Sequence, residues 1–543
     1  MSDAVDRQIN FTQREEAGRE RLGALLIVLA VAAVLMRTSW IGDDALISMQ
    51  QVRLFVAGDG IVWNPGIRVQ AFTHPAWFGV LSGLHAVTGA MFFPAILASI
   101  ALTAGAVLVL WYFVREHLVF GAGWAAMLVL SVLLSRGFVD FGTSGLEVPL
   151  SFALSAAVMW LLVFGRTGVW LWLALALLVL NRMDHAVLLG PLALGLLGRA
   201  LAERRILVIV PGALVLLAWF AFATFYFGSP LPNTYFAKVG GQISLDDRLA
   251  KGVYYLTDAF LRDGYSLGVV LLGIVAGLSR GGSFRLIALG LVLHLLYLIW
   301  VGGDFMRGRF LAVPFFVSLF LIATAITPRR AQAWAVGLIG LAIILGQPPS
   351  LDRLYSQQEL VGGIADERGF YFREFATLSP IRAWPEPAEG RFDRPSADLV
   401  FVGCGGIGYS RYTAPPRAHL IDTCALTDPF LARLPVPSDI PQRIGHASRR
   451  MPVNYAAAVK GSATPTAGAA LYDEMMLISA GPLWSRERHW AILRRLFRMG
   501  EEPPAVFRNG GSPDVIFMHS DTAKSWYEAI AATRNPPPEE VPE

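Results

Sequence analysis

Long apolar runs alternate with short polar loops between residue 22 and about residue 350. An α-helix needs about 20 predominantly apolar residues to cross the hydrocarbon core of a bilayer, and tilted or slightly shorter segments can also cross. The spacing of the runs therefore predicts a polytopic, mainly α-helical membrane bundle. Its eleven predicted spans cover residues 22–40, 95–114, 118–135, 148–164, 168–181, 185–198, 206–227, 266–279, 285–301, 310–326 and 332–347.

One further apolar segment, residues 77–93, decides the predicted topology. It is apolar enough to span, but it is interrupted by Gly79, Gly83, His85 and Gly89. If it lies along the interface or re-enters the membrane, the basic loop residues all fall on the side of the Arg-rich N-terminus. These residues are Arg115, Arg166, Arg199, Arg204, Arg205, Arg280, Arg285, Arg329 and Arg330. Because basic loops stay in the cytoplasm, we expect an interfacial segment, a cytoplasmic N-terminus and an external C-terminal part.

Four parts follow from this pattern. Residues 1–21 form a cytoplasmic segment, 22–350 the transmembrane domain, 351–533 an extracytoplasmic soluble α/β domain, and 534–543 a disordered tail rich in Pro and Glu. In the soluble part, residues 398–402 and 418–422 are predicted strands, and the stretch 471–498 is predicted to be helical.

Composition supports a membrane protein and argues against nucleic-acid binding. Hydrophobic residues make up 55% of the 543 residues and charged residues only 16%, whereas soluble proteins carry about a quarter. The basic balance, a net charge of +4, is explained by cytoplasmic loops. The two cysteines, Cys404 and Cys424, are predicted either to form one disulfide in an exported domain or to remain two buried thiols.

The candidate chemistry begins with Asp43 and Asp44, which directly follow the first predicted span. An unpaired carboxylate pair in hydrocarbon is costly, so the pair either caps a helix or lines a water-filled cavity. The predicted topology brings four other polar motifs to the same face. They are residues 143–147, 181–184, 230–238 and 302–309. This convergence favours a site in which a partly desolvated carboxylate removes a proton from a sugar hydroxyl.

Cations and carboxylates of these motifs would complete the site. The cations would hold the phosphate of a lipid-linked substrate, although contact with lipid headgroups is an alternative; they are Arg182, Lys238, Arg307 and Arg309. Glu147 and Asp304 would pair with these cations or bind acceptor hydroxyls. Short spans on both sides of residues 181–184 predict that Arg182 and Asp184 lie in a cavity below the outer interface.

Two other motifs carry weaker predictions. Residues 403–408 fit the G-x-G-x-x-G pattern, but the following residues predict at most one helical turn, so a strand–loop–strand is favoured over a dinucleotide site. No histidine spacing predicts a metal site, and His446 suits a structural hydrogen bond.

The motifs together resemble the C-type polyprenyl-phosphate-dependent glycosyltransferases. The chain is most similar to the terminal arabinofuranosyltransferases of mycobacterial cell-wall synthesis (AftB-like) and to the related ZomB-like proteins. Besides the motifs above, residues 64–69, 366–368, 421–422 and 443–446 carry the resemblance. Arg307 stands where the family usually has His, and Met183 where it has Pro.

The resemblance implies a C-type fold and catalysis by Asp43 or Asp44 on the outer face of the plasma membrane. A pentofuranose, arabinofuranose above all, would pass from a polyprenyl-phosphate donor to a glycan or glycoprotein acceptor. The substrate-binding residues would be Glu147, Arg182, Asp184, Asn233, Lys238, Asp304, Arg307, Arg309 and His446. The sequence assigns no cofactor, although the second carboxylate could bind a divalent cation. A lipid-linked sugar flippase and a non-catalytic envelope protein are the alternatives.

Overall fold

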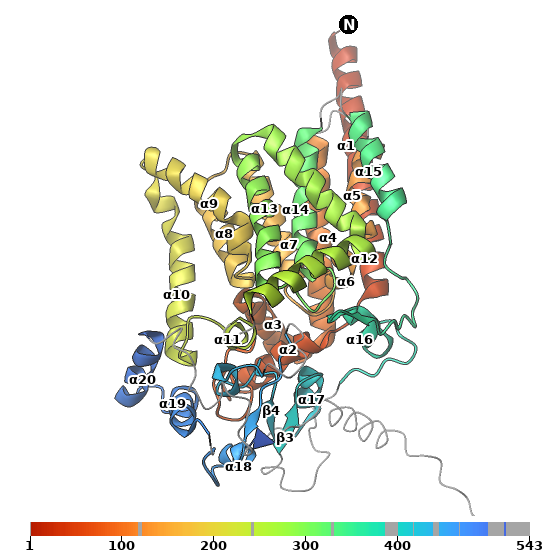
Figure 1. Cartoon of the computed structure of the whole chain (residues 1–543). Helices are drawn as coiled ribbons and strands as arrows, with labels where there is room; N and C mark the ends of the chain where they lie inside the picture. Colours follow the sequence, from red (N-terminus) through yellow and green to blue (C-terminus); the bar gives the residue numbers. More distant parts are fainter. Residues whose placement is uncertain are drawn as a thin grey trace, which may run out of the picture.

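The computed structural model describes residues 2–117, 122–239, 244–326, 331–385, 400–415, 418–437, 445–465, 467–497 and 515–516. These residues form a helical bundle with a smaller C-terminal region, residues 351–516, at its lower end (Figure 1). The predicted tail at 534–543 and the basic pair Arg329 and Arg330 lie outside the described residues.

Six helices of the described part are long and apolar enough to cross a membrane. They are α1 (Ser2–Thr38, through its segment Gly18–Thr38), α4 (Phe92–His117), α9 (His185–Ala202), α10 (Val210–Phe227), α12 (Leu245–Arg280) and α13 (Gly282–Val301). Leucines on their outer faces are exposed, as expected for helices surrounded by lipid tails. The protein is therefore a multi-pass helical membrane protein.

The other five predicted spans correspond to shorter apolar helices. They are α5 (Ala122–Leu130) with the 3₁₀ turn η1 (Ser131–Leu134), α7 (Val148–Val163), α8 (Val169–Asn181), α14 (Arg309–Ala325) and α15 (Ala331–Leu345). With 13 residues, α8 is well below the length that crosses a bilayer without local thinning. Eleven crossings therefore stay a prediction.

Close helix contacts in the bundle depend on small residues. Lipid tails are as apolar as leucine, so helices in a membrane associate by tight packing, which glycine allows. Helix α14 is buried along almost its whole length, and α12 approaches it where a Cβ on Gly273 would lie 2.4 Å from the Ser318 side chain. Helices α9 and α13 meet where a Cβ on Gly290 would lie 1.8 Å from the Leu188 carbonyl oxygen.

Helix α12 changes direction at Asp263, whose φ and ψ are −146° and 46°. Its first half is amphipathic and begins with Ser244, which accepts a hydrogen bond from the Asp247 backbone N–H. Only its second half is continuously apolar, in agreement with the span predicted at 266–279. The first half runs along the lower end of the bundle (Figure 1).

Short helices and loops close this lower end. They are α2 (Asp43–Val56), α3 (Pro75–Thr88), α6 (Arg136–Phe141) and α11 (Asn233–Lys238), and a short turn η2 (Ile206–Val208) lies before α10. Helix α3 has 14 residues and ends at Gly89, whose φ of 67° is left-handed. It contains most of the apolar segment 77–93, and it is too short to cross a bilayer by itself.

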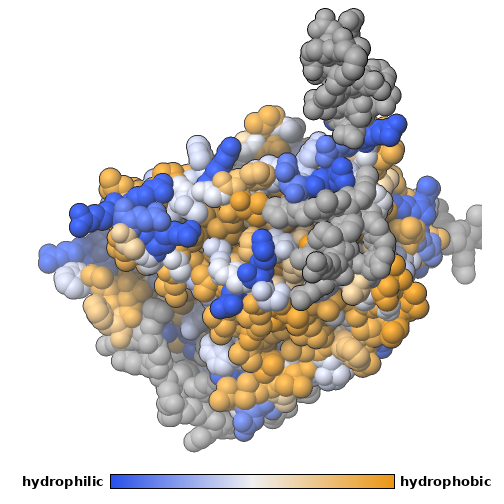
Figure 2. Space-filling model, turned by 90° about the horizontal axis from the view of Figure 1, so that it is seen from above, coloured by the Kyte–Doolittle hydropathy of each residue, from blue (hydrophilic) through white to orange (hydrophobic). Residues whose placement is uncertain are grey.

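The two ends of the bundle differ in the structure attached to them. Helix α1 begins at the upper end, where α9 and α10 are also connected (Figure 1). Arg115, near the end of α4, lies 3.5 Å from Glu20, near the start of the apolar segment Gly18–Thr38 of α1. Seen from this end, hydrophilic groups are separated by broad hydrophobic areas (Figure 2). The C-terminal region lies at the opposite end, which agrees with an odd number of crossings.

The C-terminal region mixes short strands and helices. Its elements are β1 (Leu360–Val361), β2 (Ile364–Ala365), α16 (Glu367–Phe375), β3 (Val400–Gly403), α17 (Ile407–Thr413), β4 (His419–Asp422), η4 (Leu431–Arg433), β5 (Met451–Pro452), α18 (Tyr455–Ala458), α19 (Ala469–Ala480), α20 (Arg486–Phe497) and β6 (Val515–Ile516). Strands β1–β2 and β5–β6 are antiparallel pairs, and β3 pairs with β4 in parallel. Ion pairs attach α16 to α6, with 2.9 Å from Arg368 to Asp140 and 2.9 Å from Arg136 to Asp366.

One prediction for this region needs correction. The strand–loop–strand expected around residues 403–408 is wrong, because the seven-residue helix α17 follows the glycines and the strands run parallel. The helical structure predicted for 471–498 is confirmed in its described residues as two helices, α19 and α20, with Gly481 and Pro482 between them. The strands predicted at 398–402 and 418–422 are confirmed in their described residues as β3 and β4.

Replacing Gly290 by alanine is expected to destabilise the bundle by about 1–3 kcal/mol, because the new methyl group would overlap the Leu188 carbonyl of α9. Thermal unfolding in detergent measures the effect. The matched control is Gly190→Ala in α9, where a Cβ meets no atom within 4 Å. Equal melting temperatures for both variants would contradict the close α9–α13 packing.

Candidate active site

Three loops meet where the first helix leaves the bundle. The Gly42 backbone N–H donates to the Ser144 carbonyl at 3.0 Å, and the Trp77 indole donates to the Gly145 carbonyl at 2.9 Å. Gly145 has a φ of 79°, and a Cβ there would lie 2.9 Å from the Ala45 Cβ. Only glycine allows this approach, which brings residues 143–147 against the start of α2.

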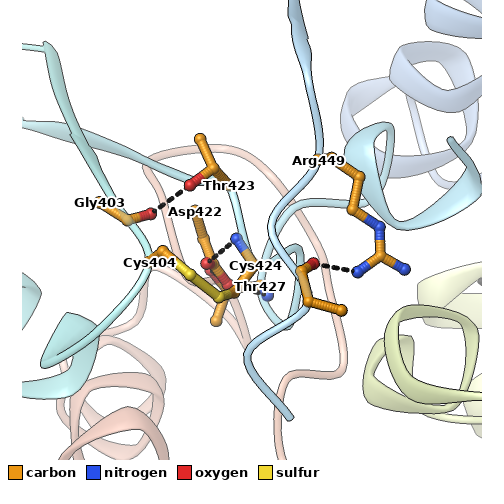
Figure 3. The surroundings of a disulfide bond; sticks show 8 residues. Gly403, Cys404, Asp422, Thr423, Cys424, Thr427 and Arg449 are labelled. Atoms are coloured by element: carbon orange, nitrogen blue, oxygen red, sulfur yellow. Dashed lines mark hydrogen bonds between the residues drawn. A yellow bond between two sulfur atoms is a disulfide. The ribbon is translucent and has the colours of Figure 1, made fainter. Parts of the chain in front are cut away.

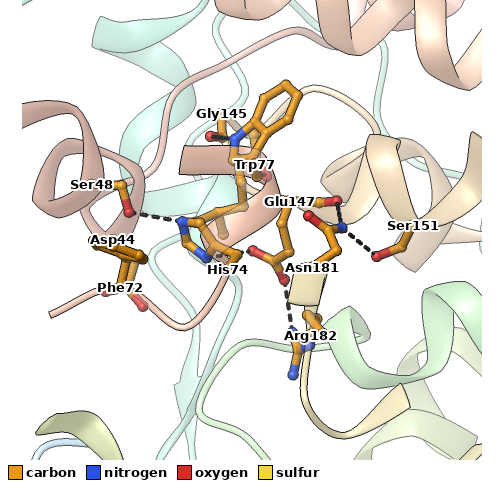
Figure 4. A network of polar contacts seen from close by, with 12 residues as sticks. Asp44, Ser48, Phe72, His74, Trp77, Gly145, Glu147, Ser151, Asn181 and Arg182 are labelled. Carbon is orange, nitrogen blue, oxygen red and sulfur yellow. Dashed lines mark hydrogen bonds and ion pairs between the residues drawn. The ribbon is translucent and has the colours of Figure 1, made fainter. Parts of the chain in front are cut away.

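Glu147 is the centre of a buried polar cluster. Its carboxylate lies 2.9 Å from Arg182 and 3.3 Å from the His74 ring (Figure 4). The Arg309 guanidinium lies 3.1 Å from the same carboxylate. Burial opposes ionisation of Glu147, but Arg309 and Arg182 outweigh it and hold the pKa of this carboxyl well below its usual range. The cluster therefore contains a permanently ionised carboxylate with two guanidinium partners.

His74 links this cluster to α2. Its Nε2 lies 2.8 Å from the Ser48 hydroxyl and its Nδ1 lies 3.3 Å from Glu147 Oε2, so the ring lies between Ser48 and Glu147. Burial lowers the pKa of His74 to about 4, a shift that Glu147 opposes. A neutral ring at physiological pH thus supports the cluster without adding charge.

Arg182 and Asp184 form a pair within the connection from α8 to α9. The Arg182 Nε and Nη2 donate to the two Asp184 oxygens at 2.8 and 3.1 Å, and Nη1 donates to Glu147. The guanidinium also lies 4.6 Å from the Phe310 ring centroid. Each of its three guanidinium nitrogens donates to a carboxylate, so Arg182 holds the cluster together rather than presenting a free cation.

Arg309, the first residue of α14, connects Glu147 to two further carboxylates. Its Nη1 lies 4.0 Å from both Asp44 Oδ2 and Asp304 Oδ2. Asp304 Oδ1 accepts from the Phe305 backbone N–H, whereas the buried Oδ2 has no hydrogen-bond partner among the described residues. Gly308, with a φ of 77°, makes the turn that aims Arg309 inward.

Asp44 is the most accessible carboxylate of the cluster. Its side chain is 23% exposed, against 4% for Asp304 and 0% for Glu147. No described residue donates a hydrogen bond to it. Burial raises the pKa of Asp44, while Lys238 and Arg309 counteract that effect. A poorly paired carboxylate with a raised pKa suits proton abstraction from a hydroxyl group.

Lys238 supplies a cation without a fixed partner. No carboxylate of the described residues lies within 4 Å of its ammonium group, which is 5.4 Å from the Phe305 ring centroid. It ends α11, whose position depends on the C-terminal region. Arg449 donates to the Ala237 carbonyl at 2.6 Å, and the Asn233 amide donates to the carbonyls of Ala425, Leu426 and Asp428.

Asp43, the neighbour of Asp44, faces the C-terminal region. Its two oxygens accept from the backbone N–H groups of Tyr409 at 2.7 Å and Gly408 at 3.1 Å, at the start of α17. A Cβ on Gly408 would lie 2.1 Å from the Asp43 carbonyl oxygen. The glycine motif therefore allows close backbone approach, and its N–H groups bind a side chain of the protein itself.

Three residues predicted to bind substrate have other surroundings. Arg307 is bound to Asp258 through Nε and Nη2 at 3.0 and 3.2 Å and to Glu359 at 2.9 Å, so it is not presented to Asp44. The Asn233 amide is engaged by backbone carbonyls. His446 packs its ring edge-on against Phe305, with 4.7 Å between centroids.

Cys404 and Cys424 form a disulfide, which decides between the two predicted alternatives (Figure 3). It joins the residue after β3 to the turn after β4. In that turn Asp422 accepts from the backbone N–H groups of Cys424 at 2.9 Å and Thr427 at 3.0 Å. The disulfide thus connects the segment that binds Asp43 to the segment that binds Asn233.

Sequence reasoning missed His74, Ser48, Asp258 and Glu359 as partners of the charged motifs. Of these, only His74 had a signal, since it precedes Pro75 at the start of α3 in the loop predicted to lie on the same face. The described residues contain no group of three or more potential metal ligands. A divalent cation bound by the second carboxylate of the Asp43–Asp44 pair stays a prediction.

Asp43 predicts a distinctive pH dependence. Burial raises its pKa to about 7, from 3.8 in the unfolded chain, although the Tyr409 N–H favours the charged form. The folded state thus favours the protonated carboxyl, and stability is lost as pH rises from about 4 to about 7. Asp43→Asn is expected to remove this loss, which is of the order of a few kcal/mol.

Melting temperatures at pH 4.5 and 7.5 would measure the effect. The control is Asp59→Asn, an exposed carboxylate in the loop after α2. Wild-type protein should lose stability relative to Asp43→Asn at the higher pH, and Asp59→Asn should follow the wild type. Parallel curves for all three proteins would rule out a buried, protonated Asp43.

Comparison with known proteins supports the similarity of these motifs to glycosyltransferases. No protein-family profile matches the chain, and no solved structure is significantly similar to it. The chain is 30% identical to the terminal β-(1→2)-arabinofuranosyltransferase of Mycobacterium tuberculosis over 437 aligned residues, which cover 67% of this chain and 68% of the relative.

The enzyme of the same name from Corynebacterium glutamicum is 28% identical over 363 residues, which cover 56% of this chain and 50% of that relative. The chain therefore spans about half the length of the second relative. The similarity to the first relative extends over two thirds of both chains. The chain belongs to the terminal arabinofuranosyltransferase family and is a membrane glycosyltransferase.

Proposed function

We propose that the protein transfers a pentofuranose, arabinofuranose in view of its relatives, from a polyprenyl-phosphate donor to a cell-envelope glycan or glycoprotein. The observation that carries this proposal is the position of Asp44. It is the accessible carboxylate of an otherwise buried cluster, 4.0 Å from the Arg309 guanidinium and close enough to the Lys238 ammonium for that charge to lower its pKa. Such a site can remove a proton and stabilise a phosphate at the same place.

Asp44 would act as the general base. It would take the proton of an acceptor hydroxyl while the acceptor oxygen forms a bond to C1 of the sugar. The bond between C1 and the phosphate oxygen breaks, and prenyl phosphate leaves with the electron pair. Asp304 Oδ2, which has no hydrogen-bond partner among the described residues, would orient the acceptor hydroxyl.

Lys238 and Arg309 would bind the donor phosphate. Lys238 has no carboxylate within 4 Å among the described residues. The carboxylates nearest to Arg309 Nη1, those of Asp44 and Asp304, lie 4.0 Å away. Arg182, Glu147 and Asp184 would hold Arg309 in place through their own ion pairs. Arg307 is left out of the phosphate site because Asp258 and Glu359 occupy it.

The membrane arrangement fits a lipid-linked donor. Eleven crossings of a C-type bundle from a cytoplasmic N-terminus would place Asp44 and the C-terminal domain on the outer face of the plasma membrane. Helix α3 begins at Pro75, directly after His74 of the cluster, and Val87 near its end is 87% exposed. Its apolar surface would accept the prenyl chain while the phosphate lies at Lys238.

Replacing Asp44 by Asn is expected to lower transfer at least about 100-fold, because the amide cannot take the acceptor proton. The assay follows arabinose transfer from a synthetic prenyl-phosphate arabinofuranose to an arabinan oligosaccharide. Asp43→Asn is the matched comparison and should keep much more activity, because the side chain at position 43 points to α17. Full activity in Asp44→Asn would remove the mechanism, and equal losses in two folded variants would remove the division between the carboxylates.

Replacing Lys238 by Met is expected to raise KM for the donor about tenfold or more, because a charge-assisted contact to the phosphate is lost. The affinity for the acceptor should change much less. Lys460→Met, at an exposed lysine of the C-terminal region, is the control. An unchanged donor KM in Lys238→Met would exclude Lys238 from the phosphate site.

A further inference from the structure

The outward face of α20 is apolar although it lies at the surface of the C-terminal region. Trp490 is 54% exposed, Leu493 44% and Phe497 89%, and Trp484 just before the helix is 81% exposed. These exposures are large for aromatic side chains, which soluble proteins bury or use in contacts. The surface formed by these four residues is called the α20 aromatic face below.

Helical geometry shows that this exposure is a regular pattern. Residues 490, 493 and 497 recur at the i, i+3 and i+7 spacing of one helix face. The opposite side packs inward through Arg488, Ala491 and Ile492, which are buried. A helix at an ordinary aqueous surface would carry its polar residues where Trp490, Leu493 and Phe497 lie, so another medium must cover this face.

The position of α20 identifies that medium. Helix α20 lies beside the lower end of the apolar helix α10 and beyond the outline of the bundle (Figure 1). Arg488 donates to the carbonyls of Phe225 and Tyr226 at 2.8 and 2.9 Å, and Trp484 packs against Phe225 with 4.9 Å between centroids. Only 17% of the α10 span is buried in the protein, so most of its apolar surface faces outward directly beside α20.

Charge on α20 agrees with a lipid surface. The helix carries Arg486, Arg488, Arg494 and Arg495 but a single acid, Glu487. Arg488 binds α10 and Arg495 lies 3.9 Å from Glu474. Arg486 and Arg494 have no ion pair with a described residue and are exposed. Tryptophan and arginine together are typical of helices at the boundary between lipid headgroups and acyl chains.

We propose that α20 is an interfacial membrane anchor, with its aromatic face inserted at the headgroup–acyl boundary and with Arg486 and Arg494 on anionic lipid phosphates. The anchor would also hold α19 and the loop that leads to His74. The Arg68 backbone N–H donates to the Ser479 carbonyl at 2.9 Å, so α19 and α20 are attached to the loop that leads to His74. The anchor would therefore keep this side of the site at a constant depth.

A fluorescence experiment on full-length protein in nanodiscs tests this proposal. Trp490→Cys and Leu493→Cys are labelled with a polarity-sensitive fluorophore, since Cys404 and Cys424 are joined in a disulfide. A nitroxide near the headgroup end of the lipid acyl chains should quench both labels at least about twofold more than a label at the matched control Lys460→Cys. Equal quenching at all three positions would overturn the proposal.

Other occupants of the face give different results, and each would also overturn the proposal. Shielding that depends on protein concentration and not on nitroxide lipid would show a contact between two copies of the chain. Shielding only by an added arabinan oligosaccharide would show a glycan surface. The double variant Arg486→Gln/Arg494→Gln tests the charge, because it should reduce the extra quenching seen with anionic lipid. These exposed positions leave the fold intact.

Discussion

The buried charge of Glu147 is the constraint on which the site depends. A carboxylate taken out of water is several kcal/mol unfavourable unless cations and hydrogen-bond donors surround it. Arg182, Arg309 and His74 provide that surrounding, and they come from three separate parts of the chain. Removing one partner of such an ion pair costs about 3–5 kcal/mol. The Glu147 carboxylate therefore holds together loops that are far apart in the sequence.

The same constraint explains why Asp44 differs from its neighbours. The cations of the cluster are largely neutralised by Glu147 and Asp184, which leaves Asp44 with only partial compensation at 4.0 Å from Arg309. The C-terminal region supplies the rest of the arrangement. The start of α17 binds Asp43, and residues 425–428 together with Arg449 fix α11 and Lys238. The site is thus shared between a membrane bundle and a region outside it.

Sequence alone led to much of this arrangement. Apolar runs predicted the helices because a bilayer requires long apolar segments, and the arginine distribution predicted which loops share an end. The predicted topology therefore places Asp44, Glu147, Arg182 and Arg309 at the same end of the bundle. The glycine pattern at 403–408 did not predict the seven-residue helix α17. The start of this helix is held by hydrogen bonds from Gly408 and Tyr409 to Asp43, which is far away in the sequence.

The sequence alone determined which residues can meet at one end of the bundle. The length of the apolar segments and the charge of the loops between them decide this, and both can be read from the chain. Tertiary structure decided which partner each charge takes. Arg307 and Arg309 are two residues apart, yet one binds Asp258 and Glu359 and the other binds Glu147 beside Asp44. Asp43 and Asp44 are adjacent, yet one binds backbone N–H groups and the other is partly exposed beside Arg309. Successive side chains on a helix point about 100° apart, and only packing against distant segments gives each direction its chemistry.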